Sequence, residues 1–218
     1  MRFMGWGRNC DVVLMPDPSD YLGVTGFMAK KRPTRKAAGS SRSGVSIERS
    51  RSGQGWTLAH PAAVREGAED LDEVREMIAG GEHDVAIDEL RWLIENCTDW
   101  IEAHYLLGKL AVETQGDVPL GRAHFGFGYQ LGERALKRAD NPTPVPAMHP
   151  ANRPWYDAGR GLAWCLAELG KREMALEVVE TLLRCDPADP LSLRSWIDEI
   201  KTAGAPIVEL GGLFNRPQ

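Results

Sequence analysis

Residues 162–187, LAWCLAELGKREMALEVVETLLRCDP, decide the fold class of this chain. Apolar residues recur at helical spacing on both sides of Gly170, and Pro187 closes the second half. The stretch therefore predicts two short amphipathic helices joined by a tight turn. Because a single helical hairpin cannot bury its apolar faces alone, we expect related hairpins nearby in the chain.

The same periodicity predicts helices over most of the chain after Trp56. Pro61 suits a first helical turn, and Gly80-Gly81 and Gly116-Asp117 are turn signals. Asp99 followed by Glu102 is a helix-start signal. The expected helices cover about residues 61–79, 83–97, 99–114, 118–139, 154–169, 171–184 and 190–202, and a proline-rich loop covers 140–154.

Small and large residues recur in a pattern that resembles the tetratricopeptide repeat. That repeat places Leu-Gly in its first helix, Ala-x-x-x-Phe in its second and then a Pro, within about 34 residues. The small residue lets two helices approach closely, and the large one fills the groove beside the crossing. Thr98 departs from the pattern, because it stands where the first copy should end in Pro. The residues that carry the pattern, and that we expect to pack or turn the repeats, are Ala86, Leu107, Gly108, Gly121, Phe125, Gly170, Ala175 and Pro187.

The resemblance covers residues 60–202 and implies an all-α fold. Its expected architecture is a right-handed superhelix of about three helix-turn-helix repeats with a C-terminal capping helix. The interval from Ala86 to Gly121 is 35 residues, and that from Gly121 to Ala175 is 54, because the fourth helix and the proline-rich loop are long. Residues 56–210 are also similar to a family of small bacterial tetratricopeptide proteins of planctomycete type.

The resemblance implies a peptide-binding groove lined by the first helix of each repeat. Family members that grip a C-terminal carboxylate use Lys and Asn there, but Glu102 and Asp157 stand at such positions here. We therefore expect an apolar or basic protein segment, anchored by Tyr105 and Trp164 and complemented by the acids. Solvated helix surface is the alternative interpretation. The residues placed in the groove by register are Arg75, Ile78, Glu102, Tyr105, Lys109, Val112, Asp157, Arg160, Trp164 and Glu168.

Charge and composition divide the chain into three parts. Residues 1–55 are expected to form a disordered N-terminal arm, since they have few apolar positions. Within it, residues 28–55 carry eight Lys or Arg and one Glu, whereas residues 56–218 carry sixteen basic and twenty-seven acidic side chains. Residues 56–204 are the expected helical repeat domain and 205–218 an extended tail. Residues 1–27 are either a genuine leader or upstream sequence before a natural start at Met28.

These features favour a non-catalytic scaffold or adaptor that binds another protein. The alternative is a nucleic-acid-associated protein that contacts phosphates through residues 28–55, with the helical body as a partner or dimerisation module. A third hypothesis is self-assembly through the apolar residues 206–214.

Enzymatic, cofactor and metal functions have little support in the sequence. The glycines at 126, 128 and 132 lack the preceding strand and following Lys-Ser/Thr of a phosphate loop, so we expect them to pack a helix closely. The five histidines lack the spacing of a zinc site, and the acidic run 66–73 is typical of a solvated helix face. We therefore predict no catalytic residues, no cofactor and no metal.

Four cysteines without a CxxC pair favour reduced thiols, hence a cytoplasmic protein, and no apolar run is long enough for a membrane helix.

Overall fold

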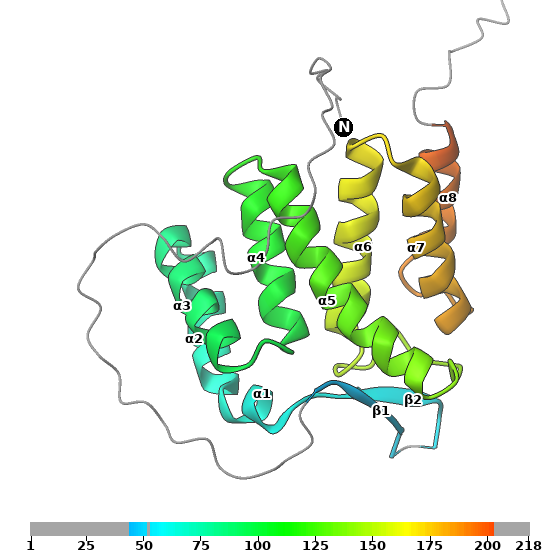
Figure 1. The fold of residues 1–218 in the computed structure, drawn as a ribbon, viewed down its shortest axis with the longest axis horizontal. Coiled ribbons are helices and arrows are strands. Elements are labelled where there is room, and N and C mark those ends of the chain that lie inside the picture. Colours follow the sequence, from blue (N-terminus) through cyan, green and yellow to red (C-terminus); the bar gives the residue numbers. More distant parts are fainter. Residues whose placement is uncertain (1–43, 52, 203–218) are drawn as a thin grey trace, which may run out of the picture. The chain divides into compact units, whose positions relative to one another are not determined.

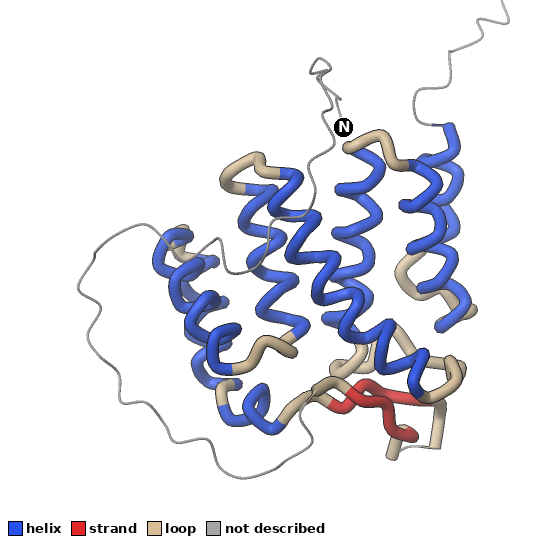
Figure 2. Tube along the Cα trace, in the orientation of Figure 1, coloured by secondary structure: helices blue, strands red, loops and turns tan. Residues whose placement is uncertain are grey.

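The computed structural model describes residues 44–51 and 53–202 (Figure 1). The predictions for the start at Met28, for residues 28–43 and for the 205–218 tail lie outside these residues. The described part begins with two strands, and every later element is a helix (Figure 2). The elements are β1 (Ser46–Arg49), β2 (Trp56–Ala59), α1 (Ala62–Glu66), α2 (Ala68–Ala79), α3 (His83–Asn96), α4 (Ile101–Glu113), α5 (Val118–Arg138), α6 (Arg153–Glu168), α7 (Arg172–Cys185) and α8 (Leu193–Thr202).

The helices from α2 onward form three successive hairpins followed by a single helix. The hairpins are α2–α3, α4–α5 and α6–α7, and α8 packs on α7. Helix α4 also packs directly on α6, and α5 packs on both of them. The helical prediction is therefore confirmed for the described residues, with one small β-hairpin added.

The predicted helix over residues 61–79 is in fact two helices, α1 and α2, separated at Gly67. A Cβ on Gly67 would lie 2.8 Å from Cη2 of Trp100, so the indole occupies the space a side chain would need. The predicted start signal at Asp99 is also wrong. Helix α4 begins at Ile101, with Trp100 at the N-cap and no side-chain cap hydrogen bond.

The predicted disorder of residues 1–55 is wrong for the residues that form β1. Strand β1 pairs antiparallel with β2, with Ile47 opposite Leu58. Val45, just before β1, and Leu58 are each only 2% exposed, because they pack into the helical core. The strands are four residues long, and the apolar partners of Val45 lie far along the chain, so the local composition gave little sign of order.

The proline-rich loop is fixed to the helices around it. The backbone N–H of Val145 donates to the carbonyl of Cys185 at 2.7 Å, and the hydroxyl of Tyr156 donates to the carbonyl of Val145 at 2.8 Å. The backbone N–H of Ala147 donates to Oδ2 of the buried Asp186 at 2.8 Å. The long insertion before α6 is thus part of the core.

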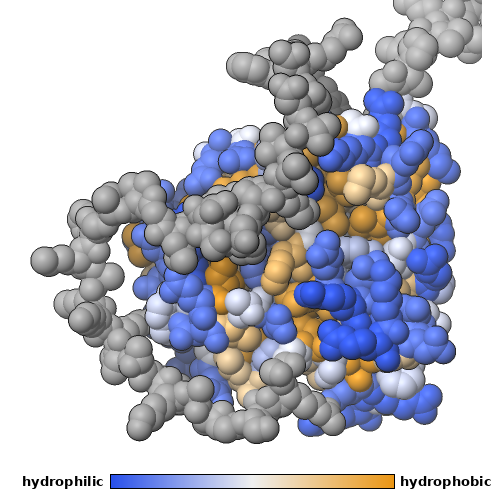
Figure 3. All heavy atoms as spheres, viewed as in Figure 1, coloured by the Kyte–Doolittle hydropathy of each residue, from blue (hydrophilic) through white to orange (hydrophobic). Residues whose placement is uncertain are grey.

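Two apolar clusters form the core, one around α2–α4 and one around α5–α8 with the β-hairpin. Glycines allow large rings into the second cluster. A Cβ on Gly132 would lie 2.4 Å from Cδ1 of Trp155, which is fully buried and stacks on Tyr129. On the face shown in Figure 3, apolar residues reach the surface in strips between polar ones, as expected when each helix turns its apolar side toward its neighbours.

The residues assigned to repeat packing lie in the following places. Ala86, Leu107, Gly108, Gly121, Phe125 and Ala175 are buried in helices, Gly170 takes a φ of 73° in the α6–α7 turn, and Pro187 is exposed after α7.

Candidate functional site

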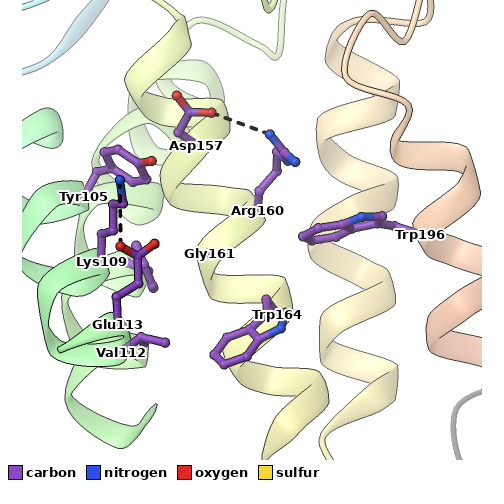
Figure 4. A pocket seen from close by; sticks show the side chains of 10 residues that line it. Tyr105, Lys109, Val112, Glu113, Asp157, Arg160, Gly161, Trp164 and Trp196 are labelled. Carbon is purple, nitrogen blue, oxygen red and sulfur yellow. Dashed lines mark ion pairs between the residues drawn. The ribbon is translucent and has the colours of Figure 1, made fainter. Parts of the chain in front are cut away.

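A shallow groove of about 360 Å³ lies between α4, α6 and α8. We call it the α4/α6 groove. Figure 4 shows side chains of α4 on one side, those of α6 along the middle and Trp196 of α8 on the other side. Its lining residues are Tyr105, Lys109, Val112, Glu113, Phe125, Asp157, Arg160, Gly161, Trp164 and Trp196.

Most of the groove residues expected from the sequence meet here. Arg75 and Glu102 do not line the groove, because they form an ion pair with each other between α2 and α4, with Nη2 and Oε1 2.5 Å apart. Glu168 is exposed at the end of α6, and Ile78 packs in the α2–α4 cluster. The expected residues that line the groove are Tyr105, Lys109, Val112, Asp157, Arg160 and Trp164.

Glycines and one phenylalanine form the floor of the groove. Phe125 of α5 is 5% exposed and fits between α4 and α6. A Cβ on Gly161 would lie 2.6 Å from Cε1 of this ring, and one on Gly108 would lie 2.7 Å from its Cδ1. The ring therefore needs glycine on both helices, because it fills the space that a side chain at Gly161 would take.

Three half-exposed aromatic side chains surround that floor. Trp164 on α6 is 38% exposed, and Tyr105 on α4 and Trp196 on α8 are partly buried. Burial, followed by the nearby charge of Asp157, raises the pKa of the Tyr105 hydroxyl, so this group stays protonated at neutral pH. The sequence analysis missed Trp196 because it treated the last helix only as a cap.

The charges in the groove are partly neutralised within α6. Both carboxylate oxygens of Asp157 accept from Nε of Arg153, at 2.9 and 2.8 Å. Arg160 is farther from Asp157, with Nη1 3.9 Å from Oδ1. Its guanidinium lies over the Trp196 ring, 5.3 Å from the centroid. Lys109 pairs with Glu113 at 3.8 Å.

Arg160 is therefore the cation that this part of the structure compensates least. Its Nε is buried and has no hydrogen-bond partner among the described residues. Asp157, its nearest acid, already binds Arg153 more closely. Stacking on Trp196 holds the guanidinium in place while its terminal N–H groups remain able to donate to a carboxylate or a carbonyl.

A second cluster of titratable groups lies between α4 and α5, where Nδ1 of His104 is 3.5 Å from Nδ1 of His124. Nε2 of His104 carries a proton, because it lies 3.0 Å from the carbonyl of Thr98, which can only accept. Burial lowers the pKa of each imidazole to about 4. Both rings are thus neutral at pH 7. Within residues 44–51 and 53–202, no three His, Cys, Asp or Glu residues are grouped as metal ligands would be.

The buried thiols of α6 and α7 are also neutral at physiological pH. Burial raises the pKa of Cys165 to about 12 and that of Cys185 to about 11. Because the thiolate is the nucleophilic form, neither group is suited to covalent catalysis.

No helix in the described part of the chain combines the length and the hydrophobicity needed to cross a membrane. The sequence matches no protein-family model, and no characterised protein is significantly similar to it.

Proposed function

We propose that this protein is a non-catalytic scaffold that binds an extended segment of another protein in the α4/α6 groove. The observation that carries the proposal is the groove itself, in which Tyr105, Trp164 and Trp196 surround a floor formed by Phe125 and Gly161. Aromatic side chains around a small depression are typical anchors for a peptide, because they offer large contact area at low entropic cost.

The proposed architecture is a tetratricopeptide-like right-handed superhelix, with α2–α3, α4–α5 and α6–α7 as its repeats and α8 as the cap. The direct packing of α4 on α6, with α5 against both, supports this assignment. The buried Gly108 and Gly121 support it too, since a Cβ on Gly121 would lie 3.1 Å from the carbonyl oxygen of Gly108. A cytoplasmic location belongs to the same proposal and is supported by the free thiols of the described cysteines.

The ligand we propose is an apolar segment. The expectation of a basic ligand depended on Glu102 and Asp157, but Arg75 and Arg153 already neutralise these carboxylates. What remains in the groove is apolar surface and the cation of Arg160, whose terminal N–H groups can donate to a ligand.

A peptide-display selection on the full chain tests this function. Selected peptides should bind Trp164→Ala at least tenfold more weakly, which corresponds to about 1.4 kcal/mol. Trp92→Ala is the matched control, because Trp92 on α3 is also 38% exposed but lies outside the groove. Peptides that bind both variants equally would exclude the groove as the binding site.

The same chain, tested with nuclease-treated and untreated cell extract, separates the alternative function. If recovered material disappears with nuclease and with deletion of residues 28–43, nucleic-acid binding through the basic arm is the better explanation.

A further inference from the structure

Arg160 is the least compensated charge of the groove, which places a condition on the ligand. Arg160 stacks on Trp196 and has a buried Nε without a partner in the part of the chain that the structure describes, while Asp157 is held by Arg153. A segment that complements this surface needs apolar side chains for Trp164 and one carboxylate for Arg160.

The chain itself contains such a segment just after α8. Residues 206–214 are PIVELGGLF, in which Glu209 is the only charged residue. Helix α8, which carries Trp196 of the groove, ends at Thr202. The segment therefore begins four residues after an element that lines the groove.

The spacing of this segment fits that of the groove. Helix α8 runs in the same direction as α6 (Figure 1), so Thr202 lies about 9 Å beyond the level of Trp196 and Arg160 along the helix axes. The five residues from Thr202 to Ile207 can span about 17 Å. The side chains of Arg160 on α6 and Trp196 on α8 already meet across the gap between these helices, with the guanidinium 5.3 Å from the ring centroid, so a chain of this length can cross it. Gly204 and Pro206 are residues that favour a turn here.

An extended segment returning along α6 would meet the groove in register. Ile207 and Glu209 are two residues apart and would face the same side, about 6.6 Å from each other. Trp164 and Arg160 are four residues apart on α6, about 6 Å along its axis. When Ile207 contacts Trp164, Glu209 therefore reaches Arg160.

We propose that residues 206–214 bind the α4/α6 groove of their own chain, with Glu209 paired to Arg160 and Ile207 against Trp164. This inference rests on the proposed function, since it takes the groove to be a peptide-binding site. The tail then acts as an internal ligand, and a segment of another protein binds only by displacing it.

Photo-crosslinking in the full chain tests the proposal. Benzoylphenylalanine replaces Trp164 in one chain and the equally exposed Trp92 in the control chain. Irradiation of the first should produce a crosslink to residues 206–214, found by mass spectrometry, and irradiation of the control should not. A mixture of heavy-isotope and light chains should give crosslinks within one chain, and crosslinks between heavy and light chains would assign the groove to a second copy and overturn the proposal.

Charge reversal tests the pairing itself. Glu209→Arg should lower the crosslink yield at least fivefold, and Arg160→Glu combined with it should restore the yield. Thermal melting confirms that the double variant is folded. No crosslink to the tail, or a yield that Glu209→Arg leaves unchanged, would overturn the proposal.

The two proposals fail in distinguishable ways. If displayed peptides depend on Trp164 but the tail does not crosslink, the groove binds external segments and the internal ligand is wrong. In the second case the tail crosslinks, but a peptide-display selection on the Glu209→Arg chain still yields no peptide whose binding depends on Trp164. The groove then serves the tail alone, and the scaffold function is wrong.

Discussion

Replacing Asn152 with Ala should separate the β-hairpin from the helical core. The amide of Asn152 is fully buried, and its Oδ1 accepts from the backbone N–H of Leu58 at 2.8 Å. Its Nδ2 donates to the carbonyls of Trp56 at 3.1 Å and Pro146 at 2.9 Å. One side chain therefore joins β2, the proline-rich loop and the start of α6.

The cost of Asn152→Ala follows from the groups it leaves without partners. A buried polar group that loses its hydrogen bond costs about 1–3 kcal/mol, with a donor N–H at the upper end and carbonyls at the lower. The Pro146 carbonyl still accepts from the backbone N–H of His149 at 3.2 Å, so the groups left without a partner are the Leu58 N–H and the Trp56 carbonyl. One N–H and one carbonyl, plus the cavity left by the amide, give a loss of about 3–5 kcal/mol. That is a large share of the roughly 5–15 kcal/mol by which a domain is stable.

Urea unfolding followed by circular dichroism measures this loss in the free energy of unfolding. The matched control is Asn96→Ala, because Asn96 is exposed on α3 and its side chain donates to the carbonyl of Trp92 one turn earlier in the same helix. The control should change the free energy by less than about 0.5 kcal/mol. A loss below about 1 kcal/mol for Asn152→Ala would refute the reasoning, since it would mean that water or a shifted loop satisfies both the Leu58 N–H and the Trp56 carbonyl.

Three further perturbations test other parts of the structure. The folded pKa values of His104 and His124, about 4, lie below the usual 6.5, so the unfolded chain binds protons more tightly than the folded one. The free energy of unfolding should therefore fall by a few kcal/mol from pH 7 toward pH 4, as measured by urea titrations at each pH, and His124→Gln should make this fall smaller. Gly161→Ala should weaken the binding of selected peptides at least tenfold, measured by calorimetry, because the new methyl would displace the Phe125 ring that forms the groove floor; unchanged affinity would mean that the floor is not in contact with the ligand. In native protein Cys97 should react with a thiol reagent faster than Cys165, because Cys165 is buried and its thiol stays protonated; mass spectrometry of early time points measures the order. The reverse order would mean that α6 opens readily.

Local patterns were enough to locate the helices from α2 onward. Each of these helices places apolar residues at helical spacing, and the turns carry glycines such as Gly81, Gly116 and Gly170, which take positive φ. Their sequence signals are local, so a single sequence contains them. The helix bounds differ from the expected ones by only a few residues, apart from the break at Gly67.

The β-hairpin could not be found in this way, because its stability comes from distant residues. Strand β1 is four residues long, with the sequence SIER, and Ile47 is its single apolar residue. Leu58 is buried against the core, and its N–H is satisfied by Asn152, 94 positions later in the chain. A propensity averaged over the basic arm records neither contact, which is why the segment resembled disorder.

The charge that the groove offers to a ligand cannot be judged from the identity of its lining residues alone, because it depends on which of them are already paired. Assigning Asp157 to the groove was sufficient to suggest a basic ligand, but a carboxylate attracts a cation only if no other cation holds it. Arg153 precedes Asp157 by four residues on α6, a spacing at which opposite charges pair on one helix face, so this neutralisation was visible in the sequence. The pair between Arg75 and Glu102 was not, since it joins two helices 27 residues apart in the chain. With both acids engaged, the charge left to a ligand is that of Arg160, and the groove favours a carboxylate where the list of residues alone favoured a base.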